Sequence, residues 1–242
     1  MKRAIFLTAY NRLNYLQETL DSWSRVRGLK DWHFVASIEP SSFQDQVVEE
    51  FTEFARKVGL DSIEIRINPE RYGVLSHPWQ GFQDLLDRRN FDFAVRAEDD
   101  LVVSDDILEY FTWASETYRN DPRVATVNAF SLVDSTDTHA VVHDDGFSAW
   151  LWGTWADRWN TYLVSTWDHD YSTFNGSPGN QSGWDWNLDT RVFPTFDVHS
   201  VRPEVSRVDN IGVYGVHGTE ENFIQAASFS RHHEPGIFFE RQ

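Results

Sequence analysis

The sequence predicts an α/β fold with a mostly parallel central sheet and helices on both faces. Short apolar runs rich in β-branched residues alternate with amphipathic helical patterns through about residue 130. This alternation is typical of βαβ crossovers, which build parallel sheets. The chain has 242 residues, of which 40% are hydrophobic and 24% charged, and this composition suits one globular domain of that class.

Five segments have the pattern of buried strands. Each is a short, largely apolar run, and polar or turn-forming residues bound it. The segments are Ala4–Ala9, Phe34–Ile38, Ile63–Ile67, Phe91–Ala97 and Val124–Ala129. Because nearly continuous apolar runs are typical of strands covered on both sides, we expect helices on both faces of the sheet.

Helical spacing of apolar residues fills the intervals between these strands. Leu16, Leu20 and Trp23 predict a first helix, and Ser41 with Gln44 forms a capping box ahead of a second. Two more helices are expected over 75–86 and 107–118. The last of these has Ser104 as its predicted N-cap, with Asp105 and Asp106 at its positive end.

Residues after Phe130 change to short aromatic-rich pieces, with loop residues around 175–180 and two predicted helices near 155–164 and 184–192. This second part has no linker before it and looks too small to hold a core of its own. We therefore expect it to extend the same sheet and to carry loops of the functional site, so that residues 1–242 form a single domain.

Composition excludes several classes of function. The 38 acidic residues against 21 Lys and Arg give a formal charge of −17, which disfavours nucleic acid and anionic lipid as partners. No apolar run is long enough to span a membrane or to serve as a signal sequence. The absence of cysteine removes thiol chemistry and favours a reducing, cytoplasmic location.

Three consecutive carboxylates, Glu98, Asp99 and Asp100, follow directly on a predicted buried strand. Adjacent acids repel one another and raise one another's pKa unless a cation is present, and ligands of open α/β sheets bind at the carboxyl ends of strands. These acids therefore indicate a divalent-cation site. The alternative is a solvated acidic turn that helps to cap the following helix.

Other chemistries find weaker support. The sequence has no phosphate-binding glycine loop, nucleophile elbow or HExxH motif. The segment Asp168–Asp170 imitates a metal motif but follows no apolar strand, and the adjacent His232 and His233 have no evident partner. Tryptophans at four positions could line a sugar subsite, although core packing is the commoner role: Trp150, Trp152, Trp155 and Trp159.

The order of these motifs resembles the catalytic domain of N-acetylglucosaminyltransferase I, an inverting glycosyltransferase family of the GT-A fold. The resemblance rests on segments that keep the family's order over roughly 90% of the chain. They are Thr8–Arg12, Glu98–Leu101 with the helix Ile107–Phe111, Phe147–Trp152, Gly183–Trp186, and Arg202–Arg207 with Gly215–Gly218.

The resemblance implies roles for individual residues on the donor side. Arg12, Glu39 and His77 match residues that contact the nucleotide, with Glu39 at the uracil. Glu98 resembles the residue at the transferred sugar and Asp99 the one near the ribose.

Further residues match the family's metal and acceptor side. Asp100 resembles the single protein ligand of Mn²⁺, for which Mg²⁺ could substitute. Trp184 and Asp185 match the aromatic wall and the catalytic base, while Val216 and His217 lie in the loop over the diphosphate. The alternative for Asp185 is a helix N-terminal acid behind a Ser182 cap.

The resemblance thus implies a metal-dependent inverting enzyme that moves a sugar, N-acetylglucosamine being favoured, from a UDP-sugar to a glycan or glycoconjugate. Residues 1–130 would bind the nucleotide sugar and residues 131–242 the acceptor. Glu39 in place of the family's Asp, and Trp152 with Gly153 in its sugar loop, put the identity of the sugar in question. Two other classes remain open: a carbohydrate-binding protein with a divalent-cation site, and a nucleotidyltransferase or phosphatase, which would need a second metal-binding acid.

Overall fold

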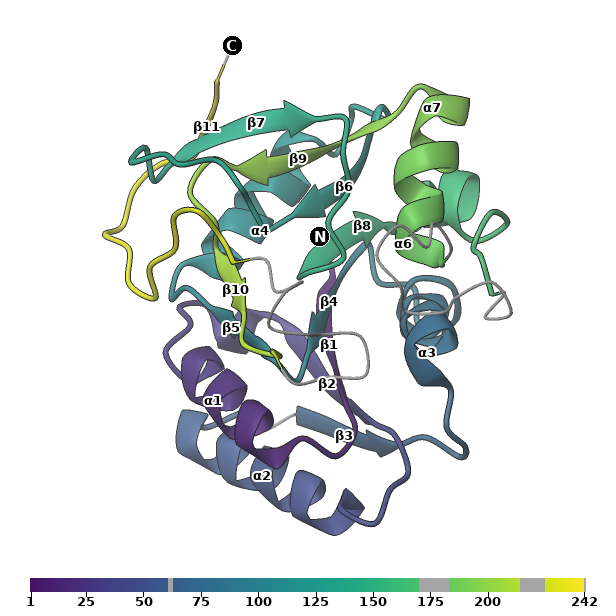
Figure 1. Ribbon diagram of the computed structural model, residues 1–242, viewed down its shortest axis with the longest axis vertical. Helices are drawn as coiled ribbons and strands as arrows, with labels where there is room; N and C mark the ends of the chain where they lie inside the picture. The colour runs from purple at the N-terminus through teal and green to yellow at the C-terminus, as the bar shows by residue number, and fades with distance from the viewer. Residues whose placement is uncertain (61–62, 170–182, 214–224, 242) are drawn as a thin grey trace.

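The computed structural model describes residues 1–60, 63–169, 183–213 and 225–241. Its centre is a nine-stranded sheet with the strand order β11-β7-β9-β6-β8-β4-β1-β2-β3 (Figure 1). The strands are β1 (Arg3–Ala9), β2 (His33–Ile38), β3 (Ile63–Ile67), β4 (Phe93–Glu98), β6 (Val124–Asn128), β7 (Ala140–Asp144), β8 (Trp152–Trp155), β9 (His199–Pro203) and β11 (Phe239–Glu240). A separate antiparallel pair joins β5 (Leu101–Val103) to β10 (Val208–Asn210).

The sheet is mixed but mostly parallel. β1 runs parallel to both β2 and β4, β2 runs parallel to β3, and β6 runs parallel to β9. The exceptions are β8, which lies antiparallel between β4 and β6, and β7, which is antiparallel to β9. The predicted α/β class with a mostly parallel sheet is therefore confirmed.

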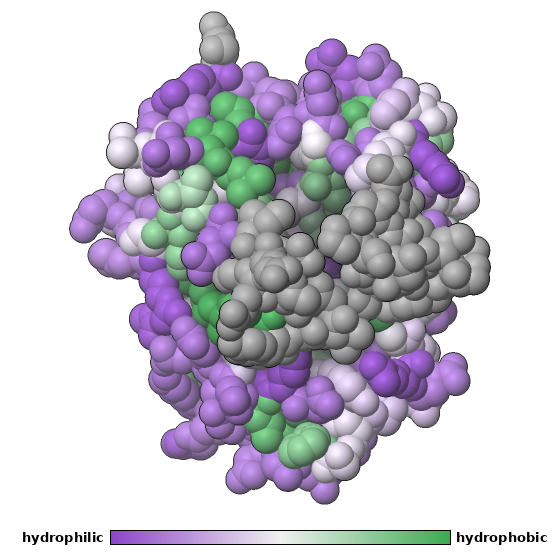
Figure 2. All heavy atoms as spheres, in the orientation of Figure 1, coloured by the Kyte–Doolittle hydropathy of each residue, from purple (hydrophilic) through white to green (hydrophobic). Residues whose placement is uncertain are grey.

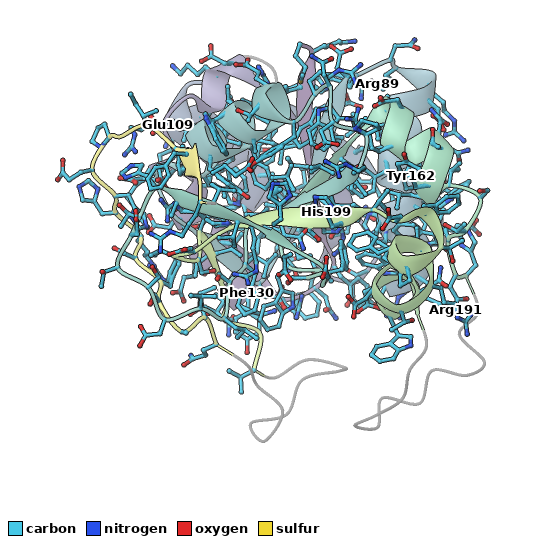
Figure 3. All side chains as sticks on the ribbon, turned by 90° about the horizontal axis from the view of Figure 1, so that it is seen from above. Arg89, Glu109, Phe130, Tyr162, Arg191 and His199 are labelled. Carbon is cyan, nitrogen blue, oxygen red and sulfur yellow. The ribbon has the colours of Figure 1, made fainter. Side chains whose placement is uncertain are left out.

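Helices cover both faces of this sheet. On one face lie α1 (Leu13–Trp23), α2 (Gln44–Val58) and α4 (Ile107–Thr117), whose apolar residues share one hydrophobic cluster. The other face is covered by α3 (Gly73–Phe82), α5 (Ala156–Arg158), α6 (Trp184–Asn187) and α7 (Phe193–Phe196), together with the π-helical turns η2 (Gln83–Arg88), η3 (Trp159–Leu163) and η4 (Leu188–Val192). Viewed from above, Glu109 of α4 and Tyr162 of η3 lie on opposite sides of the molecule (Figure 3).

Strand residues alternate between the two hydrophobic clusters, as the two-residue period of a strand requires. Ile5 and Leu7 of β1 face the first cluster, whereas Ala4 and Phe6 face the second. In β4, Ala94 belongs to the second cluster, so that Arg96, two residues on, is directed toward the same face. This places a cation in a position where the pattern calls for an apolar side chain.

Two predicted helix N-caps are wrong. The helix α4 begins at Ile107 after Asp106, and the hydroxyl of Ser104 donates to Asp106 Oδ1 instead of capping the helix. Helix α2 begins at Gln44, and Ser41 Oγ accepts from the amide of Phe43 while donating to the carbonyl of Tyr10. Neither serine caps its helix: α4 begins at Ile107 as predicted but with Asp106 before it, and α2 begins two residues after the start that a Ser41 cap implies.

The surface view shows a largely hydrophilic face with smaller hydrophobic areas among the described residues (Figure 2). None of the helices in the described ranges combines the length and apolar character that a membrane crossing needs.

Candidate functional site

The acidic turn, defined here as Glu98, Asp99 and Asp100, lies where β4 ends beside β1. Thr8 of β1 is in register with Glu98, so that Tyr10 and Arg12 leave β1 next to these acids. In the view from above, Arg89, ahead of β4, lies toward the top of the picture, and Phe130, just after β6, lies below it (Figure 3). Since β4 and β6 both run antiparallel to β8, they share one direction, and the acidic turn lies at their carboxyl ends.

Arg12 forms ion pairs with two acids of the turn. Its Nη1 lies 2.6 Å from Asp100 Oδ2, and its Nη2 pairs with Asp99 Oδ1. Asp99 is further fixed by the backbone, since its Oδ2 accepts from the Tyr10 amide at 3.2 Å and its carbonyl accepts from Thr19 Oγ1 at 3.1 Å. Both carboxylates are buried, with only 3% of Asp99 and 6% of Asp100 exposed.

This burial shapes the ionisation of the cluster. Burial raises the pKa of Asp99, and the charge of Asp100 raises it further, although Arg12 opposes both effects. Burial and the charge of Glu98 likewise raise the pKa of Asp100. Burial alone would lower the pKa of the Arg12 guanidinium, but the charges of Asp99 and Asp100 raise it above its ordinary value. The three carboxylates of the turn thus share two arginines, Arg12 at Asp99 and Asp100 and Arg96 at Glu98.

One carboxylate oxygen of Asp100 is left unbonded by the described residues. This oxygen, Oδ1, is buried, although buried carboxylate oxygens are normally bonded. The backbone approaches closely on the other side: the Ile211 amide donates to the Asp100 carbonyl at 2.9 Å, and a Cβ on Gly212 would overlap Asp100 Oδ2. An oxygen donor of this kind suits Mn²⁺ or Mg²⁺.

The described residues offer no group of three or more His, Cys, Asp or Glu side chains arranged to hold a metal. The arrangement fits instead an ion that takes one carboxylate from Asp100 and the rest of its ligands from a bound molecule, as Mg²⁺ commonly does with substrate phosphates.

Glu39 and His77 form a second polar cluster at the end of β2, and its groups bond to one another. Glu39 Oε2 accepts from the Tyr72 amide and Oε1 from the Gly73 amide, each at 2.9 Å, and His77 Nδ1 lies 3.1 Å from Oε1. The other ring nitrogen of His77 contacts Ser37 Oγ at 2.8 Å. Burial would raise the pKa of Glu39, but His77 and the two amides together lower it below its ordinary value.

Arg96 connects the acidic turn to Trp184 of α6. Its Nη2 lies 2.9 Å from Glu98 Oε2, its Nη1 donates to the carbonyl of Ala149 at 3.2 Å, and its guanidinium lies 5.3 Å from the ring centre of Trp184. Only 3% of the Arg96 side chain is exposed, against 23% for Glu98. The sequence prediction missed Arg96, although a lone cation inside an apolar strand was a usable signal.

Trp184 lies in the core of the second hydrophobic cluster. Its ring stacks with Trp167 at 4.7 Å and 8° and with Trp152 at 5.7 Å and 27°, and its Nε1 donates to the Val74 carbonyl. Because only 3% of Trp184 is exposed, it supports α6 from beneath. The next residue, Asp185, is exposed in the first turn of that helix.

The remaining sequence candidates fall outside this arrangement. Val216, His217, Asp170 and Ser182 are outside the described residues. His232 binds Asp105 through Nδ1 at 2.5 Å, and the backbone amide of His233 donates to the same carboxylate, which ties the C-terminal segment to the loop before α4. Of the four tryptophans considered for a sugar subsite, three are fully buried: Trp152, Trp155 and Trp159.

The structure thus brings together Arg12, Asp99 and Asp100 by direct contact and joins Glu98 to Trp184 through Arg96. Glu39 and His77 contact each other, and the Glu39 amide donates to the carbonyl of Ala9 at the end of β1. No contact between Asp185 and the acidic turn is recorded among the described residues. Gly212 was also missed, because its role comes from a close approach that no local pattern encodes.

Comparison with known proteins finds similarity of structure. No protein-family model and no curated protein sequence matches the chain. The mannosyltransferase PcManGT from Pyrobaculum calidifontis, solved with GDP-Man and Mn²⁺, matches 84% of this chain and 54% of its own at 14% identity and a TM-score of 0.54. GalNAc-T7 with UDP, GalNAc and Mn²⁺ matches 91% of this chain and 44% of its own at 9% identity and a TM-score of 0.56.

A third solved structure, residues 1–349 of S. aureus TarS, matches 78% of this chain and 54% of its own at 12% identity and a TM-score of 0.53. The chain therefore spans about half the length of the solved structures that it matches. Identities this low show the fold alone. The chain has the α/β fold of the GT-A nucleotide-sugar glycosyltransferases.

Proposed function

We propose that the protein is a metal-dependent inverting glycosyltransferase that moves a sugar, N-acetylglucosamine by preference, from a UDP-sugar to a hydroxyl of a glycan or glycoconjugate. The observation that carries this proposal is the acidic turn beside Arg12, where the buried Asp100 Oδ1 has no hydrogen-bond partner among the described residues. It lies at the carboxyl edge of the sheet, where ligands of open α/β sheets bind. The solved complexes of two structurally similar transferases with a nucleotide or nucleotide sugar and Mn²⁺ support the same assignment.

The resemblance to N-acetylglucosaminyltransferase I adds the finer parts of the proposal, namely uridine, N-acetylglucosamine and inversion. In this assignment Arg12 and Asp99 hold the nucleotide, Glu98 contacts the transferred sugar, and Val216 with His217 covers the diphosphate. Glu39 and His77 act by fixing the Tyr72–Gly73 backbone beside the nucleobase, because their own polar atoms are occupied. A cytoplasmic location, proposed from the cysteine-free sequence, completes the assignment.

Three requirements of sugar transfer can be assigned to residues. A divalent cation on Asp100, when bound, supplies charge that stabilises the diphosphate leaving group. Arg12 lies within reach of the same groups and can donate to a phosphate oxygen once it releases a carboxylate. Asp185, exposed at the start of α6, accepts the proton of the acceptor hydroxyl, and the buried Trp184 holds that helix in place.

The competing function is a carbohydrate-binding protein with a divalent-cation site. Such a protein needs neither a nucleotide nor a base. The nucleotide requirement therefore separates the two functions more directly than sugar binding does.

The decisive experiment is calorimetry with UDP in the presence of Mn²⁺, and again with a chelator, followed by a panel of nucleotide sugars tested for donor hydrolysis. We expect UDP to bind only with the metal, and UDP-N-acetylglucosamine to be hydrolysed fastest. Equal UDP affinity in both conditions contradicts the metal assignment. Binding of free sugar with Mn²⁺ but of no nucleotide favours the carbohydrate-binding protein.

The role of Asp185 is tested by Asp185→Asn, which keeps the shape of the side chain but removes its basicity. Turnover is expected to fall roughly 10²- to 10⁴-fold, the range typical of a lost general base, with UDP-sugar affinity unchanged. If Asp185 serves only the helix dipole, the variant loses about 1 kcal/mol of stability and keeps its turnover. Transfer rate, donor affinity and melting temperature, measured on this one variant, distinguish the two roles.

A further inference from the structure

Arg96 is a buried cation that touches three separate segments of the chain. One Nη binds Glu98 of the acidic turn, the other binds the Ala149 carbonyl ahead of β8, and the guanidinium lies over Trp184 of α6. Under the proposed function, one of these segments supplies Glu98, which contacts the sugar, and another is the helix α6, which carries the base Asp185. Arg96 is the contact that links them.

Stability alone does not account for a cation at this position. Arg96 lies on the face of β4 that otherwise packs against the second hydrophobic cluster, and its Nε finds no hydrogen-bond partner among the described residues. Replacing a buried ion pair with apolar side chains of similar size is often neutral or stabilising. A methionine would fill this space against Trp184 without leaving an unpartnered donor.

The geometry of the pair leaves Glu98 able to meet a ligand. Arg96 engages Oε2, and the side chain keeps 23% of its surface exposed. A planar guanidinium holds two acceptors in a fixed relation, which a flexible ammonium cannot do. Arg96 therefore holds the Glu98 carboxylate in one orientation.

We propose that Arg96 is a positioning residue of the transfer reaction: it holds Glu98 in the orientation that binds the transferred sugar and ties that carboxylate to the helix bearing Asp185. The inference rests on the proposed function. It assigns Arg96 no contact with the nucleotide, so that recognition of UDP and recognition of the attached sugar should respond differently to its removal.

The test compares Arg96→Met with the wild-type protein for binding of UDP and of UDP-N-acetylglucosamine, both with Mn²⁺, and for donor hydrolysis. We expect UDP affinity to be unchanged, and kcat/KM for the UDP-sugar to fall about 10- to 100-fold, as is common when the support of a contacting group is removed. Because Arg96→Met leaves Glu98 without its cation and the Ala149 carbonyl without a donor, the melting temperature is expected to fall. Arg96→Lys should fall between the two, because one ammonium cannot bond to Glu98 and the Ala149 carbonyl as the guanidinium does.

A double-mutant cycle with Glu98→Gln tests whether Arg96→Met lowers kcat/KM through Glu98. If Arg96 acts through Glu98, Arg96→Met lowers kcat/KM by less than about threefold when Glu98→Gln is already present. Fully additive losses overturn the positioning role, since they mean that Arg96 acts elsewhere.

Arg158→Met is the matched control. Arg158 is also buried, lies 4.7 Å from the ring centre of Trp155, and donates through Nη2 to the carbonyls of Tyr118, Arg119 and Asp121. This variant should lower the melting temperature and leave both affinities unchanged.

The outcomes separate the two proposals. An active wild-type enzyme whose Arg96→Met variant behaves like Arg158→Met overturns the positioning role alone. A wild-type protein that binds no nucleotide and hydrolyses no nucleotide sugar overturns the proposed function, and the positioning role with it.

Discussion

The acidic turn and the Glu39–His77 cluster are both buried polar groups at the ends of neighbouring strands, yet their interactions differ. Both oxygens of Glu39 have partners within the chain, and the pKa of this carboxyl lies below its ordinary value. Asp100 keeps one buried oxygen without a partner among the described residues, and its pKa is raised by burial and by Glu98. The Glu39–His77 cluster has its partners within the chain, whereas under the proposed function a bound ligand completes the acidic turn.

The comparison teaches that burial and charge alone do not mark a site. Both clusters contain a buried carboxylate with a cationic or ionisable partner. What separates them is whether the fold satisfies the carboxylate, because an unsatisfied buried oxygen costs stability that only a bound group can recover.

The largest expected effect comes from replacing Asp100, whose carboxylate has an oxygen without a partner among the described residues. Asp100→Asn should lower the metal-dependent affinity for UDP about 100-fold or more. Loss of a group that only supports a metal ligand costs roughly 10- to 100-fold in metal affinity, and loss of the ligand itself should cost more. Calorimetry with Mn²⁺ measures the loss. Asp168→Asn is the control and should leave binding intact, and a similar loss in that control breaks the comparison.

Arg12→Met tests whether Arg12 acts as a counter-ion that a metal can replace. It leaves Asp99 and Asp100 buried without their cation, so the metal-free protein should lose about 2 kcal/mol of stability, or roughly 4 to 8 °C in melting temperature. Mn²⁺ should raise the melting temperature of this variant more than that of the wild-type protein.

For Arg12→Met the control is Arg25→Met, which removes an exposed ion pair with Asp21 and should change little. Equal stabilisation of wild-type protein and Arg12→Met by Mn²⁺ would mean that the arginine and the metal do not share the same carboxylates.

Gly212→Ala probes the close backbone approach to Asp100. The added methyl group would overlap Asp100 Oδ2, so either the carboxylate or the chain after β10 must shift. We expect metal-dependent UDP affinity to fall about 10-fold, because misplacing a ligand by a fraction of an ångström weakens coordination. Gly146→Ala, whose methyl group would lie 3.3 Å from Asp144 Oδ1 and 3.8 Å from Asp189 Oδ1, should keep wild-type affinity.

The smallest effect on ligand binding is expected at the Glu39–His77 cluster. Glu39→Gln should cost about 1.5 kcal/mol of stability at neutral pH, because the neutral amide replaces a charged acceptor of two backbone amides. Since the pKa of Glu39 is lowered on folding, its contribution is present above the ordinary Glu value of 4.5 and is lost as the pH falls through the folded value.

The difference in stability between wild-type protein and Glu39→Gln should therefore shrink on acidification, as measured by urea unfolding against pH. Glu53→Gln, at the exposed Glu53–Arg56 pair of α2, should show a much weaker dependence, because solvent screens that pair. A large loss of selectivity for uridine over guanosine nucleotides in Glu39→Gln would instead make Glu39 a direct contact with the nucleobase.

Much of the fold could be predicted from sequence because its first strands are covered on both faces. The apolar runs of β1, β2 and β3 were predicted to within a residue, and β4 and β6 to within two. Strands such as β7 and β10 were missed, because they are short and partly polar. The helix at Pro78 continues into a π-helical turn at η2, which no local pattern distinguishes from a regular helix.

Part of the candidate site was predictable for a different reason. Glu98, Asp99 and Asp100 are adjacent in sequence. Predicting where β4 ends was therefore enough to place all three together. Arg12 reaches them through the parallel pairing of β1 and β4, which the alternating pattern indicates. The burial of Trp184 and the close approach of Gly212 to Asp100 depend on contacts between segments far apart in the chain. The spacing of residues within one segment does not predict such contacts.

The position of β8 has a consequence for how the chain is assembled during synthesis. β8 lies between β4 and β6, although β6 precedes it in sequence. The sheet of β1 to β4 can form as soon as those residues leave the ribosome, whereas β6 has no neighbour in that sheet until residues 152–155 arrive. Chains halted before that point should therefore carry a folded first half and an unpaired β6 edge, the kind of exposed strand that chaperones protect.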